Sequence, residues 1–183
     1  MTTSGMSAPA PNNPAGQHRY QTIEDKRSAV YRAYVKNPHD SRLRDALVHL
    51  STPQQIRQSA KDGIFINYSR HDELFALELA LELRAARLRV WLDMLDVPQD
   101  GDWRVEVENA LDHCGVMLAV SSPHANAPDL RRERQFFLTH GKIVVPVLHS
   151  GDASLIDTFV APIDCRTNPA VGIHTLQRLL TVR

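Results

Sequence analysis

The sequence predicts an α/β fold: a flavodoxin-like, doubly wound, five-stranded parallel sheet with an N-terminal helical extension. Short apolar runs of strand length recur after Asp62, and each of the first four is followed by polar residues and a stretch of helical spacing. A chain of 183 residues is long enough for one domain with a real core. Connections between parallel strands are right-handed, which leaves the doubly wound arrangement as the expected topology.

The chain divides into three parts along its length. Residues 1–20 are mostly small and polar and cannot bury enough apolar surface to offset their ordering entropy, so we expect a disordered tail. Residues 21–61 repeat apolar side chains at steps of three, four and seven, which predicts two amphipathic helices separated at Asn37-Pro38. A third, short helix is expected to begin at Thr52-Pro53. Residues 62–183 form the α/β domain.

Within the α/β domain, strands and helices are expected to alternate. Apolar runs predict strands at 64–68, 88–92, 116–120 and 143–148, with a weaker fifth at 160–163. Apolar stripes predict helices that include 74–85, 105–111, 128–140 and 171–181. Asp100 or Asp102 is the expected N-cap of the second of these helices, because its side chain can accept a free amide hydrogen of the first turn.

Composition argues against several classes of partner. Lys plus Arg and Asp plus Glu both number 21, so there is no basic field to attract nucleic acid or an anionic membrane. No apolar run approaches the roughly 20 residues of a membrane span and no signal-peptide pattern is present, so we expect a cytoplasmic protein. The nine histidines lack zinc-site spacing, and Cys114 and Cys165 match no metal or redox motif, so we expect no metal and two free thiols.

Ligands of such sheets bind at the carboxyl ends of the strands, where three known arrangements can be tested. The first strand is not followed by the Gly-x-Gly-x-x-Gly of a Rossmann dinucleotide site. The segment after the third strand lacks the Gly-x-Ser-x-Gly elbow of a serine hydrolase. Ser121 stands where a response regulator needs its phospho-accepting Asp. None of these chemistries is therefore expected.

Four segments in order resemble Toll/interleukin-1 receptor (TIR) domains, over about two thirds of the chain. Phe-Ile-Asn-Tyr-Ser at 65–69 is similar to the family's first box, and Arg-Val-Trp-Leu-Asp at 89–93 to its second strand. Residues 93–102 then correspond to the long BB loop. Leu-Ala-Val-Ser-Ser-Pro at 118–123 resembles the third strand, and Leu-Arg-Arg-Glu at 130–133 with Gly-Lys-Ile-Val-Val-Pro-Val at 141–147 resembles the third helix and fourth strand.

The resemblance implies a site if this chain is of the prokaryotic, NAD-cleaving type. Glu133 matches the family's essential carboxylate. Tyr68 and Trp91 would offer aromatic surfaces to the nicotinamide or adenine ring, and Arg70 a bidentate contact to pyrophosphate. Ser69 and Asp93 would hold ribose hydroxyls or the carboxamide. NAD+ is then a substrate, and no separate cofactor is expected.

The resemblance leaves two functions open. One is an NAD glycohydrolase or cyclase of prokaryotic immunity that is activated by self-assembly into an oligomer or filament, with a separate partner supplying the trigger. The other is a non-catalytic adaptor that assembles with other TIR domains. Its support is that the Trp normally found four residues before the catalytic Glu is absent, since Asp129 and Leu130 stand there. In both, the assembly loop would include Asp96, Pro98, Gly101 and Trp103.

Overall fold

The computed structural model describes residues 22–152, 155, 156 and 158–181; the tail predicted at 1–20 lies outside them. Five parallel strands form one sheet in the order β2-β1-β3-β4-β5. The strands are β1 (Ile64–Asn67), β2 (Val90–Trp91), β3 (Val116–Ser121), β4 (Ile143–Leu148) and β5 (Ile163–Asp164). This strand order confirms the predicted doubly wound, flavodoxin-like sheet.

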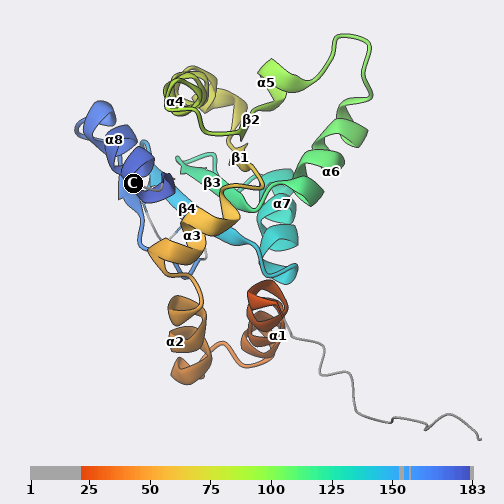
Figure 1. The fold of residues 1–183 in the computed structure, drawn as a ribbon, viewed down its shortest axis with the longest axis vertical. Coiled ribbons are helices and arrows are strands. Elements are labelled where there is room, and N and C mark those ends of the chain that lie inside the picture. The colour runs from red at the N-terminus through yellow and green to blue at the C-terminus, as the bar shows by residue number, and fades with distance from the viewer. Residues whose placement is uncertain (1–21, 153–154, 157, 182–183) are drawn as a thin grey trace, which may run out of the picture.

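Helices cover both faces of the sheet (Figure 1). On one face lie α3 (Pro53–Ser59), α4 (Glu73–Ala85) and α8 (Pro169–Leu180), packed on side chains such as Ile64 and Ile66. On the other lie α6 (Trp103–His113) and α7 (Pro128–Thr139), packed on Phe65 and Met117. Successive side chains of a strand point to opposite faces, so the apolar runs supply both cores. None of the described helices is long and apolar enough to cross a membrane.

The two edge strands are shorter than predicted. Arg87 and Leu88, which precede β2, form the end of α4 and are not part of the strand. Arg87 has a φ of 63°, its amide donates to the carbonyl of Arg84, and the Leu88 amide donates to the carbonyl of Leu83. This pattern is a Schellman cap. The fifth strand was predicted at 160–163 but pairs only at Ile163 and Asp164, because Pro162 has no N–H to offer a ladder.

Two short helices follow the first two strands where the sequence predicted only polar connections. The 3-10 helix η1 (Arg70–Asp72) follows β1, with the Ser69 side chain accepting the amide of His71. The helix α5 (Asp93–Asp96) follows β2 and shortens the expected 93–102 loop to residues 97–102. The cap of α6 is Asp102, whose carboxylate accepts the amide of Arg104 at 2.9 Å.

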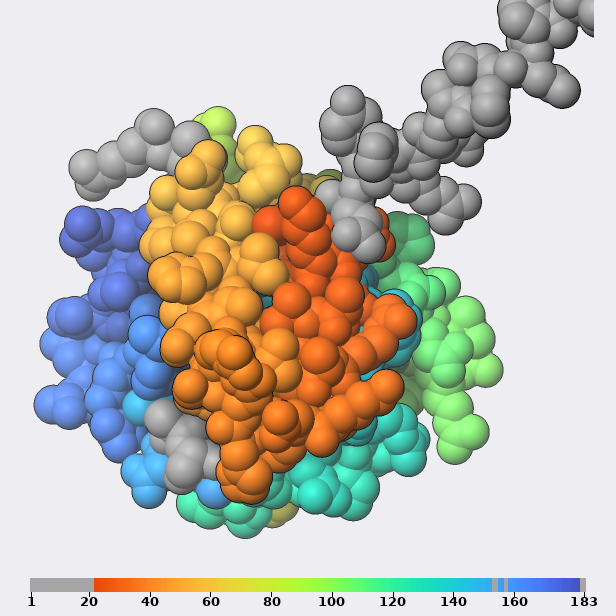
Figure 2. Space-filling model, turned by 90° about the horizontal axis from the view of Figure 1, so that it is seen from below, coloured from red at the N-terminus to blue at the C-terminus, as the bar shows by residue number. Residues whose placement is uncertain are grey.

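The N-terminal extension consists of α1 (Ile23–Lys36), α2 (Ser41–His49) and α3. The helix break at Asn37-Pro38 is as predicted. Capping boxes at Thr22 and Thr52 start α1 and α3, because each threonine and the residue three positions later satisfy each other's free amide. Helices α1 and α2 lie at the end of the molecule away from the α5–α6 loop (Figure 1), and Figure 2 shows α1–α3 as a continuous cap over that end.

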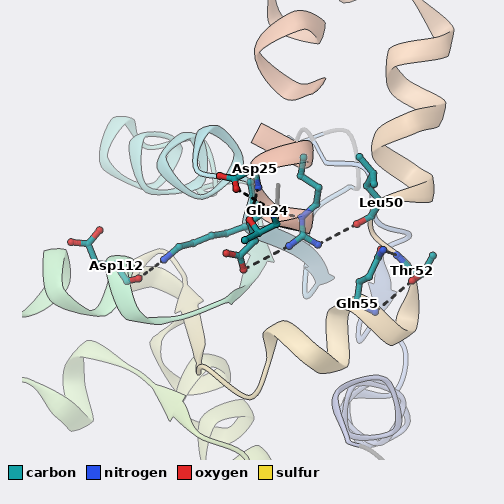
Figure 3. A network of polar contacts seen from close by, with 10 residues as sticks. Glu24, Asp25, Leu50, Thr52, Gln55 and Asp112 are labelled. Atoms are coloured by element: carbon teal, nitrogen blue, oxygen red, sulfur yellow. Dashed lines mark hydrogen bonds and ion pairs between the residues drawn. The ribbon is translucent and has the colours of Figure 1, made fainter. Parts of the chain in front are cut away.

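Buried polar contacts fasten the extension to the α/β domain. Arg27, which is 3% exposed, donates from Nε to the carbonyl of Gly141 at 2.5 Å and from Nη1 to that of Leu50 at 3.1 Å. Ser28 donates to the Thr139 carbonyl at the end of α7. Figure 3 shows the surrounding network, which reaches the carbonyl of Asp112. Because these bonds join residues more than 100 positions apart, the extension is an integral part of the fold.

Replacing Arg27 with Met should lower the free energy of unfolding by about 2–3 kcal/mol. Methionine fills a similar space but leaves the buried carbonyl of Gly141 and the part-buried carbonyl of Leu50 without the guanidinium as donor, and each lost bond costs about 1 kcal/mol or more. Urea unfolding followed by circular dichroism would measure the change. Lys26→Met is the matched control, since the neighbouring Lys26 is exposed. Equal stability of the two variants would show that the Arg27 bonds do not secure the extension.

Candidate functional site

A cavity of about 320 Å³ opens at the carboxyl edge of the sheet, between the ends of β1 and β2 and the helices α6 and α7. Doubly wound sheets bind ligands at the carboxyl ends of the strands, near the point where the strand order reverses. In this sheet the order reverses between β1 and β3. Its lining residues come from four separate parts of the chain. They are Phe65, Ile66, Tyr68, Ser69, Arg70, His71, Trp91, Asp93, Trp103, Val107, Ala127, Asp129, Leu130 and Glu133.

The structure brings the candidate catalytic and substrate-binding residues together around this cavity. They are Tyr68, Ser69, Arg70, Trp91, Asp93 and Glu133. Of the four residues assigned to the assembly loop, Trp103 also lines the cavity, whereas Asp96, Pro98 and Gly101 do not.

Glu133 is one of two carboxylates, with Asp129, that α7 contributes to the cavity. Its Oε2 accepts a hydrogen bond of 2.7 Å from Nδ2 of Asn67, at the end of β1, and no donor among the described residues bonds its Oε1. Burial raises the pKa of Glu133 to about 7. The Asn67 bond opposes this rise, the charges of Asp93 and Asp129 add to it, and the charge of Arg134 opposes it. Near neutral pH the group therefore exists in both protonation states.

The raised pKa of Glu133 should make stability depend on pH. Between about pH 4.5, the ordinary value, and about pH 7, the folded protein keeps a proton that the unfolded chain has released. The free energy of unfolding should therefore fall as the pH rises through this window. Subtracting the urea stability of Glu133→Gln from that of the wild type at each pH isolates the effect, and Glu108→Gln controls for loss of an exposed carboxylate. A difference that does not change with pH would contradict the burial of this carboxyl.

Asp93 organises the wall opposite Glu133. Its carboxylate accepts hydrogen bonds from the Tyr68 hydroxyl at 2.7 Å and from Arg70 Nη2 at 2.6 Å. The Met94 amide and the Trp103 indole, at 3.4 Å, donate to it as well. Arg70 also donates to the Tyr68 hydroxyl at 2.9 Å. The pKa of Tyr68 is raised, mainly by burial and to a smaller extent by the hydrogen bond to Asp93. Both Asp93 oxygens are thus engaged in holding this wall together.

Aromatic rings form a further part of the lining. Trp91 stacks on Phe65 with ring centroids 4.9 Å apart, so the end of β2 presents a flat apolar surface backed by the core. Trp103, at the start of α6, is 43% exposed. Aromatic faces thus come from β1, β2 and α6, whereas α7 contributes Asp129, Leu130 and Glu133 and no aromatic side chain.

The remaining loop residues have different environments. Asp96 forms an ion pair with Arg84 of α4 and accepts the Leu92 amide at 2.8 Å, so it anchors the root of the loop. Pro98 is exposed, and the Gly101 amide bonds its carbonyl at 3.0 Å in a tight turn. The protruding part of the loop is therefore residues 97–102 (Figure 1).

Two residues of the site were not singled out from the sequence. Asn67 is 1% exposed and contacts Glu133; Arg134 is 5% exposed and contacts Asn67. For Asn67, the sequence did offer a signal, because it is a polar residue at the end of an apolar strand. Arg134 carried no signal, because it sits in a run of charges typical of a solvated helix face.

Other chemistry is not assembled in the described part of the chain. No group of three or more His, Cys, Asp or Glu side chains there could hold a metal ion. Cys114 and Cys165 are free and buried, and burial raises the pKa of both thiols to about 11, which keeps them protonated and unreactive at neutral pH.

Comparison with known proteins shows the family and the fold of the chain. The family model for the TIR domain matches residues 64–180. The crystal structure of the TIR domain of the Toll-related receptor TRR-2 from Hydra magnipapillata matches with a TM-score of 0.54 and 16% sequence identity, over 66% of this chain and 98% of that one. At this identity the likeness concerns the fold. No curated protein matches the chain. The match of the family model over more than half of the chain shows that it belongs to the TIR domain family.

Proposed function

We propose that this TIR domain is an enzyme that cleaves the bond between nicotinamide and ribose in NAD+, by hydrolysis or cyclisation. The observation that supports this most is the placement of Glu133, a half-buried carboxyl group on the wall of a cavity otherwise rich in aromatic surface. A cavity of this size falls within the range of about 300–1,000 Å³ typical of small-molecule sites.

The reaction asks little of the protein. Breaking the glycosidic bond gives an oxocarbenium-like ribose, and nicotinamide leaves as a neutral molecule without an acid. A carboxylate in a site of low dielectric stabilises the developing positive charge far more than it would in water. Glu133 in its charged form would play this part through Oε1. Activity would then rise as the pH passes the Glu133 pKa of about 7.

Other residues of the cavity would contact the substrate. The stacked Trp91 and the exposed face of Trp103 would pack against the nicotinamide ring. Arg70 stands at the rim with 60% of its side chain exposed, so the pyrophosphate could replace Asp93 as its partner. Ser69 and Asp93 would meet hydroxyl groups of the ribose.

Self-assembly is the proposed switch, in a cytoplasmic immune pathway of a prokaryote. The 97–102 turn, which is exposed at residues 98–100 and 102, projects beyond the body of the domain, where it can contact a neighbouring copy (Figure 1). The 320 Å³ cavity is open at its rim, which a neighbour's loop would cover. A partner sensing infection would raise the local concentration of the chain.

A non-catalytic adaptor is the second candidate. The observation in its favour is that α7 presents Leu130, and not an aromatic residue, to the cavity. In that case the 97–102 turn would still mediate assembly, and Glu133 would have no substrate.

Incubation of concentrated protein with NAD+, with and without a crowding agent, tests the proposal. Nicotinamide is followed by chromatography, assembly by sedimentation, and Glu133→Gln serves as the blank. Release above the blank that grows with assembly supports the enzyme. No release from protein that sediments as an assembly would favour the adaptor.

A further inference from the structure

We propose that Asn67 and Arg134 are positioning residues for Glu133: Arg134 orients the Asn67 amide, and that amide holds one Glu133 oxygen so that the other is left for substrate. The inference rests on the proposed function for its catalytic consequence. Its geometric part concerns the three side chains alone.

The three side chains form a continuous chain of hydrogen bonds. Arg134 Nη1 donates to Oδ1 of Asn67 at 3.0 Å, and Nδ2 of Asn67 donates to Oε2 of Glu133 at 2.7 Å. Asn67 and Arg134 are 1% and 5% exposed, so the bond between them is buried, whereas the bond to Glu133 is part-buried beside the cavity. The contacts span 66 and 67 positions of sequence and join the end of β1 to α7.

The arginine determines which way the amide points. An Asn side chain has one accepting and one donating end, whereas a guanidinium can only donate. Oδ1 must therefore face Arg134, which directs the NH₂ group toward Glu133. The same nitrogen also lies 3.3 Å from the Leu130 carbonyl, one turn earlier on α7. Without Arg134, the amide oxygen would lose its donor, and only the two acceptors, the Leu130 carbonyl and the Glu133 carboxylate, would still favour this orientation of the amide.

The chain of bonds also favours the charged form of Glu133. A donated hydrogen bond and a nearby guanidinium both stabilise a carboxylate, and here they oppose the burial that disfavours it. The other charged groups acting on Glu133 are Asp93 from the opposite wall and Asp129 on α7, and both disfavour ionisation. Asn67 and Arg134 are thus the contacts that keep Glu133 ionisable near neutral pH.

The second oxygen of Glu133 is the part left for chemistry. Oε2 is held by Asn67, while Oε1 has no donor among the described residues although the side chain lines the cavity. A carboxylate held at one oxygen loses little further rotational freedom when the other meets a ribose hydroxyl or a developing cation. The positioning residues should therefore act on kcat more than on KM.

Asn67→Asp tests the donor with almost no change in shape. The Arg134 contact is kept, but the bond to Glu133 is lost and a like charge is added, so the Glu133 titration should move upward by about one pH unit or more. The alkaline shift should appear both in the ¹³C carboxyl NMR signal of Glu133, assigned by its absence in Glu133→Gln, and in the pH profile of kcat, with KM changed less. Asn109→Asp, on the exposed side of α6, is the matched control.

Arg134→Met and Arg134→Lys form a second, independent pair. Lysine can still donate to Asn67 and should keep the Glu133 titration near that of the wild type, whereas methionine should shift it upward. This pair decides the question if Asn67→Asp does not fold. Folded Asn67→Asp or Arg134→Met protein with an unchanged Glu133 titration and pH profile would overturn the inference. Wild-type protein that releases no nicotinamide at any pH, yet shows these NMR shifts, would overturn the proposed enzyme and leave the positioning role standing.

Discussion

Replacing Glu133 with Gln should lower nicotinamide release by about 10²–10³-fold, the usual loss when one preorganised electrostatic contact to a transition state is removed. Glutamine has nearly the same shape, and its amide oxygen can still accept the Asn67 hydrogen bond, so the pocket wall should stay in place. What disappears is the negative charge facing the cationic ribose. Because burial raises the Glu133 pKa, removing the charge should not destabilise the fold at neutral pH.

The measurement is the rate of nicotinamide release from equally assembled wild-type and Glu133→Gln protein at pH 8, where Glu133 is mostly ionised. Glu108→Gln removes a carboxylate from an exposed position on α6 and should retain wild-type release. Turnover by Glu133→Gln at the wild-type rate would show that another group stabilises the transition state. Equal loss in Glu108→Gln would point to a general effect of charge on assembly.

Gly141→Ala should cost more than about 3 kcal/mol of folding stability. Gly141 has a φ of 72°, which is strained by about 1–2 kcal/mol for a residue with a side chain. A Cβ there would also overlap the carbonyl oxygen of Glu24, so α1 would have to move away. The bonds from Arg27 to the Gly141 carbonyl and from Ser28 to the Thr139 carbonyl would be lost with it, at about 1 kcal/mol each.

Urea unfolding measures this loss, and amide hydrogen exchange in α1 locates it. Gly101→Ala is the control: Gly101 has no positive φ, and the nearest atom that a Cβ would meet is Cδ of Pro98 in the same turn, at 3.1 Å. We expect the control to change stability by less than about 1 kcal/mol. Wild-type protection of α1 in Gly141→Ala would mean that the extension does not depend on this close approach.

The strands and most helix ends could be predicted from local patterns. Buried parallel strands are continuous apolar runs, as at Val116–Ser121. The helices that begin at Pro128 and Pro53 could be predicted because proline, which lacks an N–H, suits the first helical position, where that N–H would have no partner. The errors fell at the edges of the sheet. There, β2 and β5 pair over two residues each. The cap of α4 uses the backbone before β2, and Pro162 before β5 has no N–H to donate.

Local patterns predicted some residues of the site but not the contacts between them. Residues that directly follow strands, such as Tyr68 and Asp93, could be placed together because all strands of a parallel sheet end at one edge. Their partners could not be foreseen in the same way. Asp93 accepts hydrogen bonds from Tyr68, Arg70 and Trp103 at once, and the sequence, which predicted a ligand contact for it, did not indicate these partners.

The sequence by itself determined the α/β order, the helical extension and the segments that meet at the carboxyl edge, because periodicity, caps and prolines act over a few neighbouring residues. Only the tertiary structure decided that Glu133 lies beside Asn67, that Arg134 is buried, and that Arg27 ties α1 to the turn at Gly141. The physical reason is that desolvation and buried hydrogen bonds depend on groups brought together from 66 to 114 positions apart. A charged run that looks solvated in sequence thus contains, at Glu133, a carboxyl with a pKa of about 7.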